Sequence, residues 1–70
     1  MNVTQKDFDF MKLCMTRELV ILLMEEKGYT MQQALEILYN SWTYEKLSNP
    51  ESGLFFQSPR YVFSFLENEI

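Results

Sequence analysis

The segment that decides the fold reads NSWTYEKLSNPESGLFFQSP and runs from Asn40 to Pro59. It holds the only tryptophan of the 70-residue chain, both of its prolines and one of its two glycines. Proline and glycine interrupt regular structure, whereas the residues on either side repeat apolar side chains at helical spacing. We therefore interpret the segment as the irregular centre of a helical protein.

A short helix is expected at the start of this segment, from Trp42 to Ser48. Asn40, Ser41 and Thr43 are the candidates for its N-cap, because each carries a side-chain oxygen that can accept from a free backbone N–H group. The same residue types interrupt the preceding helix. The pattern therefore predicts two consecutive helices with almost no linker between them.

A turn and a further helix are expected in the rest of the segment. Pro50 presets φ for the second turn position, and Gly53 supplies a left-handed residue after it. The run Leu54 to Gln57 is predicted to be extended. Ser58 then caps a final helix from Pro59 to Glu69, whose first position suits proline because its N–H group would be unpaired in any case.

The longest helix is predicted from Lys6 to Lys27, where apolar residues recur every three or four positions. Gly28 ends it by adopting positive φ. Two adjoining apolar stripes run along it, the first formed by Phe8, Met11, Met15, Leu19 and Leu22 and the second by Phe10, Leu13, Cys14, Val20, Ile21 and Met24. Together they are wider than one neighbouring helix would cover.

A capping box begins the next helix, which is predicted from Met31 to Asn40. The Thr30 hydroxyl can accept from the third backbone N–H, while the Gln33 side chain accepts from the N–H of Thr30. The predicted buried line consists of Met31, Ala34, Leu35 and Leu38.

These elements predict an all-α fold in a single helical domain over residues 1–70. One long N-terminal helix packs with two or three shorter helices. No significant sheet is expected, because Leu54 to Gln57 has no partner strand. A domain of this size buries only about 60% of the surface of its unfolded chain, so additional apolar contact from outside would stabilise it.

The charge and the cysteine content indicate which partners and which cellular compartment to expect. Its formal net charge is −4 and it has no histidine. Nucleic acid and anionic membranes are thus poor partners, since both attract clustered Lys and Arg. The single cysteine cannot form an internal disulfide, and the first ten residues lack the basic and apolar runs of a signal peptide. We expect a cytoplasmic protein with no membrane association.

The chain offers no set of residues that a reaction, a metal or a cofactor requires, and we predict that it is not an enzyme. A reactive Cys14 would need a base or a cation, so we expect this thiol to be buried and structural. The paired carboxylates at Asp7 and Asp9, and at Glu25 and Glu26, point in different directions along a helix and cannot converge on one ligand.

Aromatic residues are the strongest functional signal, since eight of the eleven lie from Tyr39 onward. They exceed what a small interior holds, and an apolar patch on a small protein marks an interface. The candidate interface residues are Phe10, Ile21, Met24, Trp42, Phe55 and Phe63.

The segments Ala34 to Leu47 and Ser58 to Glu69 carry a resemblance. The first follows the pattern A-L-x-x-x-Y-x-S-x-T-Y-x-x-L, and the second follows S-x-x-Y-x-x-x-x-L-x-x-E. Both resemble a family of short, functionally uncharacterised bacterial helical proteins, and with the turn between them the resemblance covers about half of the chain. Some proteins of this kind are similar to small partners encoded beside toxins. The motifs consist of caps and apolar positions, so the resemblance implies a fold and no residue's role.

Two functions are compatible with the sequence. The first is a non-catalytic protein-interaction module of antitoxin-like or accessory type, which binds a protein partner or forms a homo-oligomer through its aromatic and methionine-rich face. The alternative is a helix-turn-helix DNA-binding regulator built from Met31 to Asn40 and Trp42 to Ser48. In that alternative, Lys46 is the only cation of the second helix, opposed by Glu45.

Overall fold

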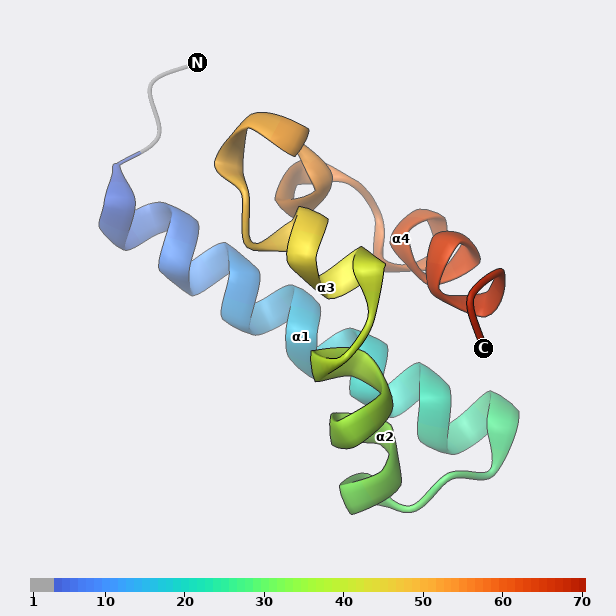
Figure 1. The fold of residues 1–70 in the computed structure, drawn as a ribbon. Helices are drawn as coiled ribbons and strands as arrows, with labels where there is room; N and C mark the ends of the chain where they lie inside the picture. Colours follow the sequence, from blue (N-terminus) through green and yellow to red (C-terminus); the bar gives the residue numbers. More distant parts are fainter. Residues whose placement is uncertain (1–3) are drawn as a thin grey trace.

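The computed structural model describes residues 4–70, and the first three residues of the predicted domain lie outside this range. Within residues 4–70 every regular element is helical and no strand occurs, which confirms the predicted all-α class (Figure 1). The elements are α1 (Gln5–Lys27), α2 (Met31–Tyr39), α3 (Trp42–Leu47), η1 (Pro50–Ser52), η2 (Leu54–Phe56) and α4 (Pro59–Glu67). The four α-helices agree with their predicted bounds to within two residues.

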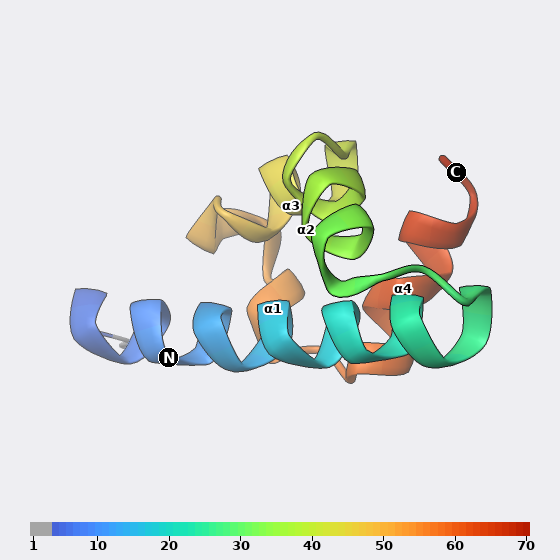
Figure 2. The ribbon, with the colours of Figure 1, turned by 90° about the horizontal axis from the view of Figure 1, so that it is seen from below.

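The long helix α1 is the element against which most of the other helices pack. Its 23 residues extend over about 34 Å at 1.5 Å per residue, and the principal dimensions of the whole chain are 37 × 19 × 19 Å. Figure 2 shows α2 and α3 stacked over one side of this rod. Because α1 also contacts η2 and α4, most of the chain is organised along a single helix.

Local capping explains where the helices begin and end. Thr4 caps α1 by accepting from the N–H of Asp7 at 3.1 Å, and Gly28 ends this helix at φ 74°. The predicted capping box is present at α2, where the N–H of Gln33 donates to the Thr30 hydroxyl and the Gln33 side chain accepts from the N–H of Thr30. Such caps satisfy backbone groups that the first and last turns leave unpaired.

The core lies between α1 and the shorter helices. Its buried apolar members are Phe8, Met15, Leu19, Val20, Leu23, Ala34, Leu38, Leu47, Leu54, Phe55, Val62, Phe63 and Leu66. The prediction that Met31 lies on the buried line of α2 is wrong, because this nine-residue helix packs through Ala34 and Leu38, and its first residue lies outside the contact. Leu23 is fully buried although it belongs to neither predicted stripe.

The prediction of an extended run from Leu54 to Gln57 is also wrong. Gly53, at φ 72°, leads into the 3₁₀ turn η2, in which the N–H of Phe56 donates to the Gly53 carbonyl at 3.1 Å. A lone extended segment would leave its backbone groups without partners, whereas a 3₁₀ turn pairs them locally. As a consequence, the side chains of Leu54 and Phe55 both enter the core.

Two ion pairs join the C-terminal end of α1 to α4. The Lys27 ammonium lies 2.9 Å from a Glu67 carboxylate oxygen, and the Arg60 guanidinium pairs with the carboxylate of Glu26. The hydrogen bond from Arg60 lowers the pKa of Glu26. Across the described part of the chain, no helix combines the length and the apolar content that crossing a bilayer demands.

Candidate functional site

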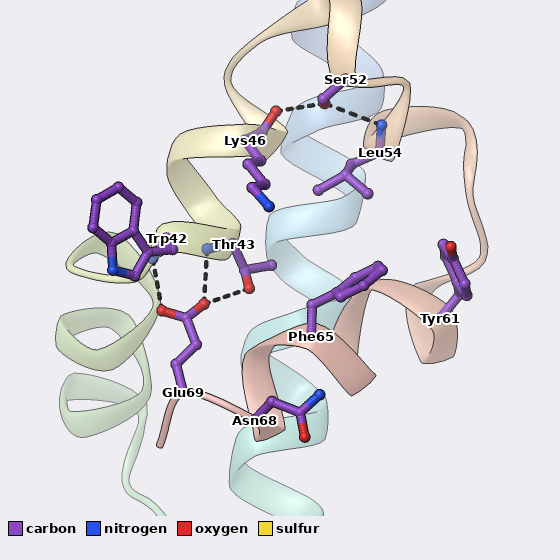
Figure 3. Close-up of a pocket in the computed structure, with 9 residues that line it drawn as sticks. All are labelled: Trp42, Thr43, Lys46, Ser52, Leu54, Tyr61, Phe65, Asn68 and Glu69. Atoms are coloured by element: carbon purple, nitrogen blue, oxygen red, sulfur yellow. Dashed lines mark hydrogen bonds between the residues drawn. The ribbon is translucent and has the colours of Figure 1, made fainter.

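An open hollow of about 620 Å³ lies between α3, the η1–η2 segment and α4 (Figure 3). We call it the aromatic cleft. Its lining residues are Trp42, Thr43, Lys46, Ser52, Leu54, Tyr61, Phe65, Asn68 and Glu69. Its volume falls within the range of about 300–1,000 Å³ that is usual for ligand-binding sites.

Three aromatic side chains give the cleft its apolar surface. The exposed fractions of Trp42, Tyr61 and Phe65 are 70%, 50% and 41%. Tyr61 and Phe65 are four residues apart on α4 and meet edge to face, with ring centroids 5.1 Å apart. Figure 3 shows Trp42 and Tyr61 toward opposite sides of the hollow, while the nearly buried Leu54 belongs to its wall.

Glu69 fastens the chain after α4 to the beginning of α3. Its carboxylate accepts from the backbone N–H groups of Trp42 and Thr43 at 2.7 and 2.8 Å, and from the Thr43 hydroxyl at 2.5 Å. Ser41 adds the local cap by accepting from the N–H of Tyr44 at 3.0 Å. These bonds satisfy the first N–H groups of α3 and fix the cleft wall that carries Trp42.

The protonation of Glu69 follows from the same contacts. Partial burial raises the pKa of this carboxylate, but the hydrogen bonds from Thr43 and from the backbone of Trp42, together with the nearby charge of Lys46, outweigh that effect. The net result is a pKa below the ordinary value. Glu69 is therefore an anion at neutral pH and complements the positive end of the helix dipole.

The contact between the Thr43 hydroxyl and Glu69 superficially resembles a nucleophile held by its base. A base with a lowered pKa is a weak acceptor of protons, and this carboxylate already accepts from two backbone groups. Thr43 itself is buried. The arrangement is suited to holding α3 in place and not to activating a hydroxyl. Among residues 4–70, acidic, histidine and cysteine side chains form no cluster that could hold a metal ion.

Two of the six candidate interface residues are corrected by the structure. Phe55 and Phe63 are only 5% and 1% exposed. Phe55 packs edge to face on Phe8 with ring centroids 4.9 Å apart, because the 3₁₀ turn directs it inward. Phe63 is the largest fully buried side chain of the core. Neither can form an exposed surface in this fold.

The other four candidates lie on two elements, Trp42 on α3 and Phe10, Ile21 and Met24 on α1. Trp42 borders the aromatic cleft, whereas Phe10 borders a separate shallow hollow of about 180 Å³ beside Phe55. Ile21 is exposed on α1, and Met24 is half-buried against the core. An interface formed by the exposed apolar residues of α1 stays a prediction.

Cys14 also differs from its prediction. It is half-buried and lines the same shallow hollow as Phe10, instead of lying in the interior. The cause is the direction in which α1 presents its faces, since Phe8, Met15 and Leu19 point into the core and Cys14 lies to one side of them.

Among the residues that line the cleft, only Trp42 was predicted as a site residue, and those that were missed include Lys46, Tyr61, Phe65 and Glu69. The spacing of Tyr61 and Phe65 was a readable signal, because residues four apart share a helix face. The role of Glu69 had no such signal, since its partners lie 26 and 27 residues earlier in the chain. Comparison of the chain with protein-family models, curated proteins and solved structures finds no match.

Proposed function

We propose that this protein is a non-catalytic interaction module that docks a partner protein in the aromatic cleft. The observation that carries the proposal is the grouping of exposed Trp42, Tyr61 and Phe65 around one hollow. Tryptophan and tyrosine are enriched among the residues that dominate binding energy at protein interfaces. Removing the apolar surface of these rings from water stabilises a complex by about 25 cal/mol for each Å² that the partner covers.

Preorganisation supports the same proposal. The Glu69 cap fixes the start of α3, and the edge-to-face contact between Tyr61 and Phe65 restrains both rings. Binding of a partner would then cost little conformational entropy, because these side chains are already restrained before the partner binds. An antitoxin-like or accessory role in the cytoplasm is the form of this function that we propose, in keeping with the acidic charge and the single cysteine.

The DNA-binding alternative is less favoured by the site. The start of a recognition helix contacts base edges in a helix-turn-helix protein, whereas here the carboxylate of Glu69 occupies the start of α3. The first N–H groups of α3 are therefore not free to contact a phosphate. Lys46 is the only cation within α3, and few phosphate contacts mean weak binding to nucleic acid.

The proposal is tested by recovering partners from native cells with tagged wild-type protein, Trp42→Ala and Phe65→Ser, with Phe10→Ala as the control outside the cleft. The partner is then purified and its affinity measured directly. Loss of a central aromatic anchor costs about 2 kcal/mol or more, so we expect Trp42→Ala to weaken binding at least about 30-fold. Phe10→Ala should leave the affinity unchanged.

Analytical sedimentation of the purified protein tests whether a second copy of the chain occupies the cleft. Dimerisation that Trp42→Ala abolishes would make another copy of the chain the partner. A partner whose affinity is unaffected by both Trp42→Ala and Phe65→Ser, in variants with native circular dichroism, would refute docking in the cleft.

A further inference from the structure

We infer that the occupant of the aromatic cleft is a peptide segment of the partner that presents an apolar side chain together with a neighbouring carboxylate. This inference rests on the proposed function and adds the chemistry of the partner. The apolar side chain would lie against Trp42, Tyr61 and Phe65, and the carboxylate would pair with Lys46. The polar groups of the cleft carry the argument.

The carboxylate of the cleft is already engaged in hydrogen bonds. Glu69 is its only acidic residue, and it is engaged at the start of α3 by three hydrogen bonds. The Ser52 hydroxyl is used in the same way, because it donates to the carbonyl of Lys46 at 2.6 Å and accepts from the N–H of Leu54 at 3.3 Å. A basic partner would therefore have to compete with these hydrogen bonds for the one carboxylate of the cleft.

Donors, by contrast, remain free. Lys46 is the only cation of the lining, and within residues 4–70 its ammonium forms neither an ion pair nor a hydrogen bond. The Tyr61 hydroxyl and the Asn68 amide also have no side-chain hydrogen bond within the described part of the chain, and each of them can either donate to or accept from a bound group. Figure 3 shows the Lys46 side chain extending into the hollow between Thr43 and Leu54. A carboxylate that enters beside the aromatic rings would meet a donor that lacks a partner.

The net charge of −4 would by itself favour a basic partner. Distant surface charges are screened beyond about 8 Å at physiological ionic strength, however. The groups within the cleft act at contact distance and determine which segment is accepted there. Charge complementarity at that distance provides specificity more than raw affinity.

The test selects random 12-residue peptides, displayed on phage, against the full chain, with Trp42→Ala used for counter-selection. We expect the Trp42-dependent peptides to combine an aromatic residue, leucine, isoleucine or methionine with Asp or Glu no more than four positions away. A selected peptide is then synthesised with Glu, Gln or Lys at its acidic position. Its affinity is measured by the fluorescence of Trp42, the only tryptophan of the chain.

The Glu peptide should bind about 2- to 5-fold more tightly than the Gln peptide, which is the range of a partly exposed ion pair. Lys46→Gln should make the two peptides bind equally, and Lys46→Glu should reverse the preference in favour of the Lys peptide. Lys6→Glu is the matched control, because it changes the net charge equally on an exposed part of α1 away from the cleft lining and should preserve the preference for Glu. Circular dichroism verifies that each variant is folded, and Lys46→Gln suffices if Lys46→Glu is not.

Three results would overturn the inference: no Trp42-dependent peptide, Trp42-dependent peptides without acidic enrichment, or a preference for Glu that persists in Lys46→Gln. Each leaves the proposed function standing if a protein partner from cells still depends on Trp42 and Phe65. Loss of that dependence as well would refute the proposed function itself. The two failures are therefore distinguishable.

Discussion

Replacing Glu69 should destabilise the protein through α3, although the residue lies beyond the end of α4. In Glu69→Ala the N–H groups of Trp42 and Thr43 lose their acceptor, and the buried hydroxyl of Thr43 loses its partner. Helix α3 has only six residues and cannot hold itself together without such contacts. The change therefore affects one wall of the aromatic cleft as well as the free energy of unfolding.

The size of the effect can be worked from the contacts. Loss of an N-cap side chain costs about 1 kcal/mol, and loss of a charge that complements the helix dipole costs about 0.3–1 kcal/mol. Glu69 is largely exposed, so solvent screening keeps the sum near the lower values. We expect Glu69→Ala to lower the free energy of unfolding by about 1–2 kcal/mol, and Tm by about 4–8 °C for each kcal/mol.

Measuring the free energy of unfolding over a range of pH separates the effect of the Glu69 charge from the effect of its shape. The pKa of Glu69 is lowered from 4.5 in the folded protein. Its contribution is therefore complete above pH 4.5 and is lost as the pH falls through the folded pKa. Glu69→Gln keeps the shape but cannot titrate. The difference between wild type and Glu69→Gln in the free energy of unfolding should be largest at pH 7 and shrink below pH 4.5.

Urea denaturation followed by circular dichroism measures both effects. Glu36→Gln is the control, because it removes an exposed carboxylate of α2 and should change the free energy of unfolding by less than about 0.5 kcal/mol. If Glu69→Ala were as stable as wild type at pH 7, or if the Glu69→Gln difference were independent of pH, the capping role would be refuted.

Two further predictions concern the core and the single thiol. Phe63→Ala should lower the free energy of unfolding by about 3–5 kcal/mol, since it removes the largest fully buried side chain. Phe10→Ala is the control and should change the free energy of unfolding by less than about 0.5 kcal/mol. Equal midpoints of urea denaturation for these two variants would contradict the assigned core. Cys14 should react with Ellman's reagent in the native protein, because its thiol is half-buried beside a hollow. The rate of this reaction should be lower than that of a small free thiol and higher than the rate of global unfolding. A reaction rate equal to the unfolding rate would show that the native structure shields the thiol.

The helices were predictable because their ends are encoded locally. Thr30 with Gln33, Gly28, and Ser58 followed by Pro59 each fix a terminus through residues no more than five positions away. Contacts of this range depend on backbone geometry that the residue types themselves favour.

Which helix faces are buried was less predictable. Spacing alone assigned Met31 and Leu35 to the same line as Ala34 and Leu38, but the direction from which α1 approaches α2 selects among them. The 3₁₀ turn at Leu54 was missed for a similar reason, because an apolar run without a partner strand can pair its backbone locally.

The cleft could be predicted only in part. Trp42 was recognised as an interface candidate from its residue type, and it does line the cleft. Its companions Tyr61, Phe65 and Glu69 come from the other end of the chain. They line the same cleft as Trp42 only because α3 and α4 pack together, and no periodicity within a single helix reports that packing.

The long-range cap also has a consequence for the order in which the protein is made. Thr43 leaves the ribosome 26 residues before Glu69 does. At about 5–20 residues per second, the start of α3 waits roughly 1–5 s for its acceptor. During that interval α1 and α2 can pair, while the third helix has only the Ser41 cap. The start of α3 is thus fully capped only after Glu69 has been synthesised, and the aromatic cleft forms only once the segment that carries α4 has followed α3.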